Sequence, residues 1–129
     1  MAIIVYNRTK EDHSAHPYNF PIYRGGSILG NPYTDKPVSK TMAVYQVKTR
    51  EEAIQRYGSY FDMQYGRNKE FTEVIDCIYE LYKRGETVYL ECYCDPLPCH
   101  GHIIVQKLQK RLLKEKIKEA KERRKHEMG

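Results

Sequence analysis

Three cysteines and two histidines crowd into one short stretch of the sequence. Cys92, Cys94 and Cys99 fall within eight residues, and His100 and His102 come directly behind them. Thiolates and imidazoles are ligands that zinc prefers, and a cysteine close to a histidine is also the pairing of an activated nucleophile. We therefore expect the chemistry of the protein at this segment, residues 92–102, which we name the Cys-His turn.

Three interpretations of the Cys-His turn stay open. In the first, Zn²⁺ is held by Cys92, Cys94, Cys99 and either His100 or His102, although the spacing C-x-C-x4-C-H differs from the usual paired C-x2-C knuckles. In the second, Cys99 is a reactive thiolate with His100 or His102 as proton carrier, which would make Cys99 and His100 catalytic. In the third, the cysteines pack beneath a tight turn and His100 satisfies a backbone group.

A glycine-rich loop over residues 24–32 is the second candidate site. Its candidate ligand-binding residues are Arg24, Gly25, Gly26, Ser27, Gly30 and Asn31. Glycines let backbone amides approach a phosphate closely, and an arginine can hold it with two hydrogen bonds. The loop matches neither G-x-G-x-x-G nor G-x4-G-K-[ST], and its composition also suits an ordinary turn. A small phosphate-containing ligand is the partner we expect here.

The elements that must position these residues alternate between strands and helices. Expected strands cover residues 2–6, 22–23, 42–47 and 87–93, expected helices cover residues 50–65, 69–84 and about 98–125, and residues 33–41 look irregular. This alternation predicts an α/β fold, a single small layered domain whose short, mostly parallel or mixed sheet is flanked by helices, with a long C-terminal helix. Ligands gather where strands end and helices begin. Asn7 and Arg8, the glycine loop and the Cys-His turn are therefore expected to form one site.

Local signals define the ends of the two central helices. Thr49 and Glu52 form a T-x-x-E capping box ahead of the first helix. Gly85 is well placed to end the second helix in the left-handed conformation. Cys77 lies inside that second helix, where we expect it to be a small core residue. The last helix is expected to begin near residues 98–102, which would place Cys99 and His100 in its first turn, where the helix dipole favours a thiolate.

Positive charge is concentrated at the C-terminal end of the chain. The 129 residues carry a formal net charge of +5, whereas residues 107–129 contain ten Lys or Arg and four Glu, a charge of +6 that leaves −1 for the rest. We divide the chain into an α/β domain, 1–113, and a charged helical extension, 114–129. Such an extension can bind nucleic acid non-specifically, with affinity that falls steeply as salt rises. The interpretation that we favour from the sequence is a solvated helix with pairs such as Glu119–Arg123.

The compartment follows from what the sequence leaves out. No apolar run approaches the roughly 18 residues of a membrane span, and no signal peptide precedes the first expected strand. We therefore expect a cytoplasmic protein without a membrane partner. Clustered cysteines in that setting more often serve metal or redox chemistry than disulfides.

Four segments together resemble a known family. They are VYNR (5–8), YRGGSILGNPY (23–33), EEAIQRY (51–57) and LECYCDPLPCHGHII (90–104). Their joint occurrence is similar to domain of unknown function family 4326, found in bacteria and bacteriophages, over roughly residues 2–108. The resemblance implies a small α/β domain with a shared site, but no reaction. The family pattern points to Asn7, Arg8, Arg24, Gly30, Asn31, Pro32, Cys92, Cys94, Cys99 and His100. Family members usually carry an acidic residue where this chain has His102.

The leading functional hypothesis is binding or catalysis directed at a nucleotide or nucleoside. Its site would combine the Asn7/Arg8 strand end, the glycine loop and the Cys-His turn. One alternative is a zinc-stabilised, non-catalytic binding module with a nucleic-acid-binding basic tail. Another is a phage-type interaction protein.

Overall fold

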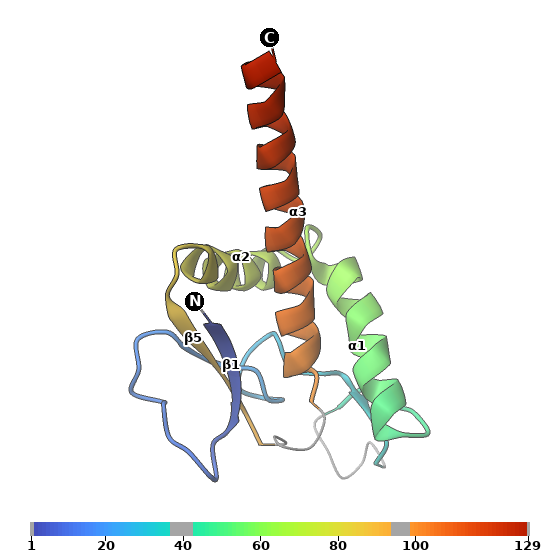
Figure 1. The fold of residues 1–129 in the computed structure, drawn as a ribbon. Helices are drawn as coiled ribbons and strands as arrows, with labels where there is room; N and C mark the ends of the chain where they lie inside the picture. The colour runs from blue at the N-terminus through green and yellow to red at the C-terminus, as the bar shows by residue number, and fades with distance from the viewer. Residues whose placement is uncertain (1, 37–42, 94–98, 129) are drawn as a thin grey trace.

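The computed structural model describes residues 2–36, 43–93 and 99–128, with side chains as far as residue 125. The described elements are β1 (Ala2–Asn7), β2 (Asn19–Pro21), β3 (Tyr33–Thr34), β4 (Tyr45–Gln46), α1 (Arg50–Gln64), α2 (Lys69–Lys83), β5 (Thr87–Cys92) and α3 (Gly101–Met128). They confirm the expected α/β class and the long C-terminal helix (Figure 1). No described helix is both long and apolar enough to cross a membrane.

The main sheet is parallel and places the last strand in the middle. Strand β5 pairs with β1 on one side and with β2 on the other. In this register Asn7 lies opposite Cys92, and Pro21 lies opposite Glu91, so the carboxyl ends of all three strands meet at one edge. Strands β3 and β4 form a separate parallel pair.

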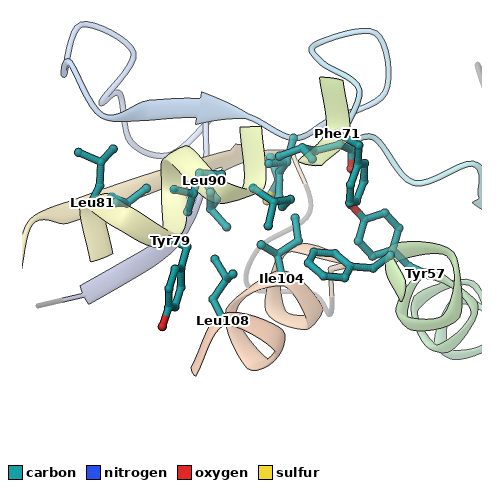
Figure 2. Packing of buried hydrophobic residues seen from close by; sticks show 14 of the residues in the cluster. Tyr57, Phe71, Tyr79, Leu81, Leu90, Ile104 and Leu108 are labelled. Carbon is teal, nitrogen blue, oxygen red and sulfur yellow. The ribbon is translucent and has the colours of Figure 1, made fainter. Parts of the chain in front are cut away.

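One face of the sheet packs on the helices. Side chains alternate along a strand, and Val88, Leu90 and Cys92 of β5 all join the hydrophobic core. Ile104 and Leu108 of α3 are also fully buried in that core. Figure 2 shows Leu90, Ile104 and Leu108 directed toward one another, with Tyr57 and Phe71 arriving from α1 and α2. Apolar burial of this kind is the main stabilising term of a small domain.

The opposite face of the sheet is covered by the loop between β1 and β2. Tyr89 and Glu91 of β5 alternate with the core residues and share their face with Tyr6, which the register places opposite Glu91. The His13 ring of the loop stacks on Tyr89 at a centroid distance of 4.1 Å and meets Tyr6 edge-on at 4.9 Å. This face is therefore aromatic and polar, in contrast to the aliphatic helix face.

The expected ends of the central helices are largely confirmed. The Thr49 hydroxyl accepts a hydrogen bond from the Glu52 amide at 3.1 Å. The Glu52 carboxylate, however, accepts from the Lys48 amide, so only half of the capping box forms as predicted. Helix α2 is capped by Asn68, and Gly85 beyond its end has φ of 90°, the left-handed conformation that glycine favours.

Other predictions about these elements are wrong. Cys77 is exposed, because at 100° per residue it points away from the buried Ile75 and Ile78. The strand predicted at residues 22–23 lies at Asn19–Pro21, where proline is tolerated because β2 is an edge strand. Residues 33–34, predicted to be irregular, form β3, which is too short to carry a sequence period.

Candidate functional site

The three groups of predicted site residues all lie at the carboxyl edge of the main sheet. Arg8, directly after β1, donates its amide to the carbonyl of Cys92 at 2.9 Å. Ile22, directly after β2, donates its amide to the carbonyl of Glu91 at 2.9 Å. The strand ends that precede the Asn7/Arg8 pair, the glycine loop and the Cys-His turn are therefore joined through the backbone of β5. Cys94 lies outside the described residues.

Asn7 shapes the turn that follows β1. Its side-chain oxygen accepts hydrogen bonds from the Thr9 amide at 2.9 Å and from the Thr9 hydroxyl at 2.7 Å. Its amide nitrogen lies 3.4 Å from the Tyr93 carbonyl, across the gap to β5. The residue is buried. These contacts let Asn7 fix the direction in which Arg8 leaves the sheet.

The glycine loop is held by bonds to its own backbone. Arg24 donates from Nε to the Asn31 carbonyl at 2.6 Å and from one terminal nitrogen to the Tyr33 carbonyl at 2.7 Å. Ser27 donates its hydroxyl to the Pro21 carbonyl at 2.6 Å. The amide of Gly26 donates to the Tyr23 carbonyl just before the loop at 2.9 Å, and the amide of Gly30 donates to the Ser27 carbonyl at 3.3 Å. These groups are engaged within the protein, so they lend no support to the predicted phosphate cradle.

Two loop glycines are required by close packing. A Cβ on Gly26 would lie 2.7 Å from the Tyr23 ring, and a Cβ on Gly30 would lie 3.0 Å from the Arg24 backbone. Gly25 has φ of 81°, a conformation that L-residues rarely adopt. Asn31 is buried and links the loop to α1 by donating to the Ala53 carbonyl at 3.1 Å. The loop sequence is therefore explained by the shape of its own turn.

Cys99 and His100 were predicted in the first turn of α3, but the helix begins at Gly101, so both residues directly precede it. Cys99 is 2% exposed and its sulfur accepts from the Gly101 amide at 3.4 Å. His100 Nδ1 lies 3.7 Å from that sulfur, and its Nε2 lies 2.7 Å from the Ile22 carbonyl. Since a carbonyl only accepts, Nε2 carries the proton and Nδ1 presents its lone pair to the thiol.

The electrostatics of His100 disfavour a role as a base. Burial lowers its pKa to about 4, and the positive charge of Arg24 acts in the same direction. The imidazole is therefore neutral at physiological pH and binds protons weakly. Together with the burial of Cys99, this describes a packed pair that is closed to an outside substrate.

The described part of the Cys-His turn also bears on the zinc interpretation. Cys92 faces the helix side of the sheet in the core, and His102 is exposed on α3. Among the described residues, no group of three or more His, Cys, Asp or Glu is arranged to hold a metal ion. Sulfur and Nδ1 of the Cys99–His100 pair are close enough to share one metal, which would still need two further ligands.

A cluster that the site prediction missed lies on the loop face of the same edge. Its centre is Glu91, a carboxylate only 4% exposed. Glu91 Oε1 lies 3.1 Å from the Tyr6 hydroxyl, 3.2 Å from Asn19 Nδ2 and 3.9 Å from Arg8 Nε. We name Tyr6, Arg8, Asn19, Tyr23 and Glu91 the carboxylate cluster. A charged residue inside a strand as apolar as TVYLEC was the sequence signal for it.

The carboxylate perturbs the tyrosines around it. Burial and the hydrogen bond to Glu91 raise the pKa of Tyr6 to about 12. Burial first, and then the negative charge of Glu91, raise the pKa of Tyr23. Perturbed ionisable groups of this kind gather at functional sites, although structural networks produce them as well.

The cluster reaches the surface through Arg8 and an aromatic pair. The Arg8 side chain is 35% exposed and forms a second ion pair, with Asp12, at 2.8 Å. Tyr23 and Tyr93 meet edge-on with ring centroids 4.9 Å apart, and Tyr93 is 51% exposed. A buried anion, an accessible cation and accessible aromatic rings therefore lie together at this edge.

An open hollow of about 850 Å³ lies elsewhere, beside β3, β4 and α1. The rings of Tyr33 and Tyr45 stack there at 5.3 Å. Its Arg56 is paired with Glu52 on the same helix. The hollow contains none of the residues that the sequence singled out as candidate ligands.

Comparison with known proteins places this geometry in a family. No curated protein and no solved structure matches the chain. The family described as Domain of unknown function (DUF4326) matches residues 5–110. That range includes the carboxylate cluster, the glycine loop and the Cys-His turn, and it ends before the last part of α3. The chain therefore belongs to the DUF4326 family.

Proposed function

We propose that the protein binds a nucleotide or nucleoside at the carboxyl edge of its parallel sheet, with the carboxylate cluster at the centre of the site. One observation carries this proposal: Glu91 is 4% exposed, yet it lies 3.9 Å from Arg8, which reaches solvent. A buried carboxylate is costly unless it is paired and hydrogen-bonded. Such a group at a strand end is suited to orient the accessible Arg8 toward a ligand.

The topology supports the same position. The residues after β1 cover the loop face of the sheet, whereas α3, the next described element after β5, packs on the helix face. Neighbouring parallel strands whose connections leave on opposite sides open a crevice at their carboxyl ends, which is where α/β proteins bind ligands. Arg8 and Glu91 lie at this point between β1 and β5.

Each group of the cluster has a role that its chemistry suits. Arg8 would bind the phosphate, exchanging its exposed partner Asp12 at little cost because surface ion pairs contribute about 0–1 kcal/mol. Glu91, which is buried, would orient Arg8 toward that phosphate. Tyr93 and Tyr23 would offer their rings to the base. Catalysis by Cys99 and His100 is left out of the proposal, since that pair is buried.

Calorimetric titration with nucleoside monophosphates and their nucleosides tests this assignment. The variant Arg8→Gln should weaken monophosphate binding about tenfold or more, the scale of one charge-assisted hydrogen bond, and change nucleoside binding little. The matched control is Arg56→Gln, which removes another arginine from an exposed pair with a glutamate. Equal losses in both variants, or no binding of any of these ligands by the parent protein, would refute the proposal.

A second candidate function is nucleic-acid binding by the projecting end of α3. The observation that favours it is the exposure of Lys and Arg along residues 114–125, beyond the packed part of the helix (Figure 1). Electrostatic binding of this kind weakens steeply with salt. Removal of residues 114–129 should abolish a gel shift of DNA at low salt. Unchanged binding by the truncated protein would contradict it.

A further inference from the structure

Helix α3 has two parts with different surroundings. In the first part, Ile104, Leu108 and Leu112 recur every four residues and are at most 7% exposed. From residue 113 to residue 125 no side chain is buried. Beyond Glu115, which pairs with α2, Figure 1 shows this second part rising clear of α1 and α2. Its surface composition is therefore not dictated by packing on the domain.

The acidic residues of the projecting part share one side of the helix. At 100° per residue, Glu115, Glu119 and Glu122 continue the direction of the buried row. Glu115 pairs with Lys83 of α2 at 3.1 Å and with Arg111 at 3.8 Å. The glutamates of residues 110–125 thus lie on the same side of α3 as the buried residues of its first part.

Every charged residue on the opposite side is a cation. These cations are Lys110, Lys114, Lys116, Lys118, Lys121, Arg124 and Lys125, all exposed. We name them the basic face. They spread over an arc of roughly 200° centred on Ile117, which points about 180° away from Leu108. Arg123 stands at the border with the acidic side. None of the ion pairs found among the described residues involves the basic face.

An apolar ridge runs along the middle of the basic face. Leu113 and Ile117 are 59% and 48% exposed, and they are followed by Ala120. Lys116 flanks this ridge on one side, and five lysines flank it on the other: Lys110, Lys114, Lys118, Lys121 and Lys125. From Lys110 to Lys125 the face is roughly 22 Å long at 1.5 Å per residue.

We propose that the basic face docks into the major groove of duplex DNA. The inference rests on the proposed nucleic-acid binding by α3, and it specifies the kind of nucleic acid and the groove that the helix enters. The B-form major groove is about 12 Å wide and admits one helix, and its two walls are rows of phosphates. Cations over an arc of roughly 200° can reach both walls at once, while the apolar ridge faces the base edges and thymine methyl groups.

Other polyanions fit this arrangement less well. A flat membrane surface meets only a narrow sector of a helix, and residues 110–125 contain no aromatic anchor. The major groove of A-form RNA is too narrow to admit side chains. Because the contacts go mainly to phosphates, the binding carries little sequence specificity.

Fluorescence anisotropy of the full chain tests the proposal with a labelled DNA duplex of two helical turns. The variant Lys114→Gln/Lys118→Gln/Lys121→Gln should reduce the slope of log K against log salt by about three, near 0.9 for each phosphate that is no longer neutralised. The control Lys10→Gln/Lys48→Gln/Lys69→Gln removes the same charge from other elements and should leave the slope unchanged. Circular dichroism verifies that both variants are folded.

Three further probes separate the possible outcomes. The same sequence as an RNA duplex and as a single DNA strand should bind at least tenfold more weakly, and netropsin, which fills the minor groove, should not compete. Equal binding of all three nucleic acids would overturn the groove proposal but keep nucleic-acid binding. Absence of binding to any of them at low salt would overturn both. Binding of phosphatidylserine vesicles without binding of DNA would assign the face to a membrane surface and also overturn both.

Discussion

Two polar regions at the same sheet edge use their side chains in opposite ways. In the glycine loop, the bonds of Arg24, Ser27 and Asn31 end on backbone groups of the protein. In the carboxylate cluster, Tyr6 and Asn19 bond to Glu91 through their side chains, at 3.1 and 3.2 Å. The first region is a device for holding a turn. The second is a network of functional groups on a rigid strand.

This difference shows how composition misleads. Glycines with an arginine suggest an anion site. Here, however, the arginine donates to backbone carbonyls that have no strand partner in a loop. A buried backbone carbonyl left without a partner costs about 1–3 kcal/mol, so the loop requires its arginine irrespective of any ligand. We therefore expect variants of the loop to change stability, and variants of the cluster to change binding.

The largest contrast should come from the two arginines. Arg24→Met removes two charge-assisted hydrogen bonds to carbonyls and should lower the free energy of unfolding by about 3–5 kcal/mol. Arg8→Met breaks an exposed pair with Asp12 and a 3.9 Å contact with the buried Glu91, which keeps its hydrogen bonds to Tyr6 and Asn19, and it should cost about 1–2 kcal/mol. Urea denaturation measures both. Equal losses would mean that the cluster is as structural as the loop.

His100 bonds to the Ile22 carbonyl just before the glycine loop. Its titration should make the stability of the protein sensitive to acid. Burial lowers its folded-state pKa from 6.5 to about 4, so the unfolded chain binds a proton first. Stability is thus complete above pH 6.5 and falls as the pH drops toward 4, by about 3 kcal/mol in total. The variant His100→Gln retains a donor for the Ile22 carbonyl but does not titrate.

Unfolding measured between pH 7 and 4.5 checks this prediction. Over that range the His100→Gln variant should lose less stability than the parent. Parallel curves for the two proteins would show that His100 does not carry the acid dependence. The carboxylates with lowered pKa, such as Glu52, act at lower pH and are common to both proteins.

Much of the fold could be predicted from the sequence because its signals are local. The cap at Thr49 and the apolar spacing of α2 lie within single elements. The position of β2 could not be predicted in the same way, since a three-residue edge strand is defined by its pairing with β5. The exposure of Cys77 follows from its angle on α2, which the residue type alone does not indicate.

The sequence predicts where the candidate site lies but not all of the residues that form it. Strand ends pointed to the correct edge through Asn7 and Arg8. Glu91 was missed because its burial and its contacts with Tyr6 and Asn19 join residues 85 and 72 positions apart. Such contacts exist only once the parallel register is known. The same register places Cys92 on the helix face, which its spacing from Cys99 does not reveal.

A matched pair of asparagines sharpens the comparison at a smaller scale. Asn31→Ala removes a buried amide that donates to the Ala53 carbonyl and accepts from the Tyr33 amide, with an expected loss of about 2–3 kcal/mol. Asn19→Ala removes a half-buried amide bonded to side chains that can rearrange, with an expected loss of about 1 kcal/mol. Thermal and urea unfolding compare the two. A larger loss at Asn19 would reverse the assignment of the two regions.

Tyr6→Phe tests the cluster with the smallest change. It removes the hydroxyl that lies 2.6 Å from Asn19 Oδ1 and 3.1 Å from Glu91, at an expected cost of about 1–2 kcal/mol near neutral pH. The folded-state pKa of Tyr6 is raised from 10.0 to about 12, so the parent keeps its stability below pH 10 and loses it as the pH rises toward 12. The deficit of the variant should therefore shrink across that interval. A deficit that stays constant from pH 9 to 12 would mean that Glu91 and burial do not act on this hydroxyl, and the carboxylate cluster would lose its electrostatic centre.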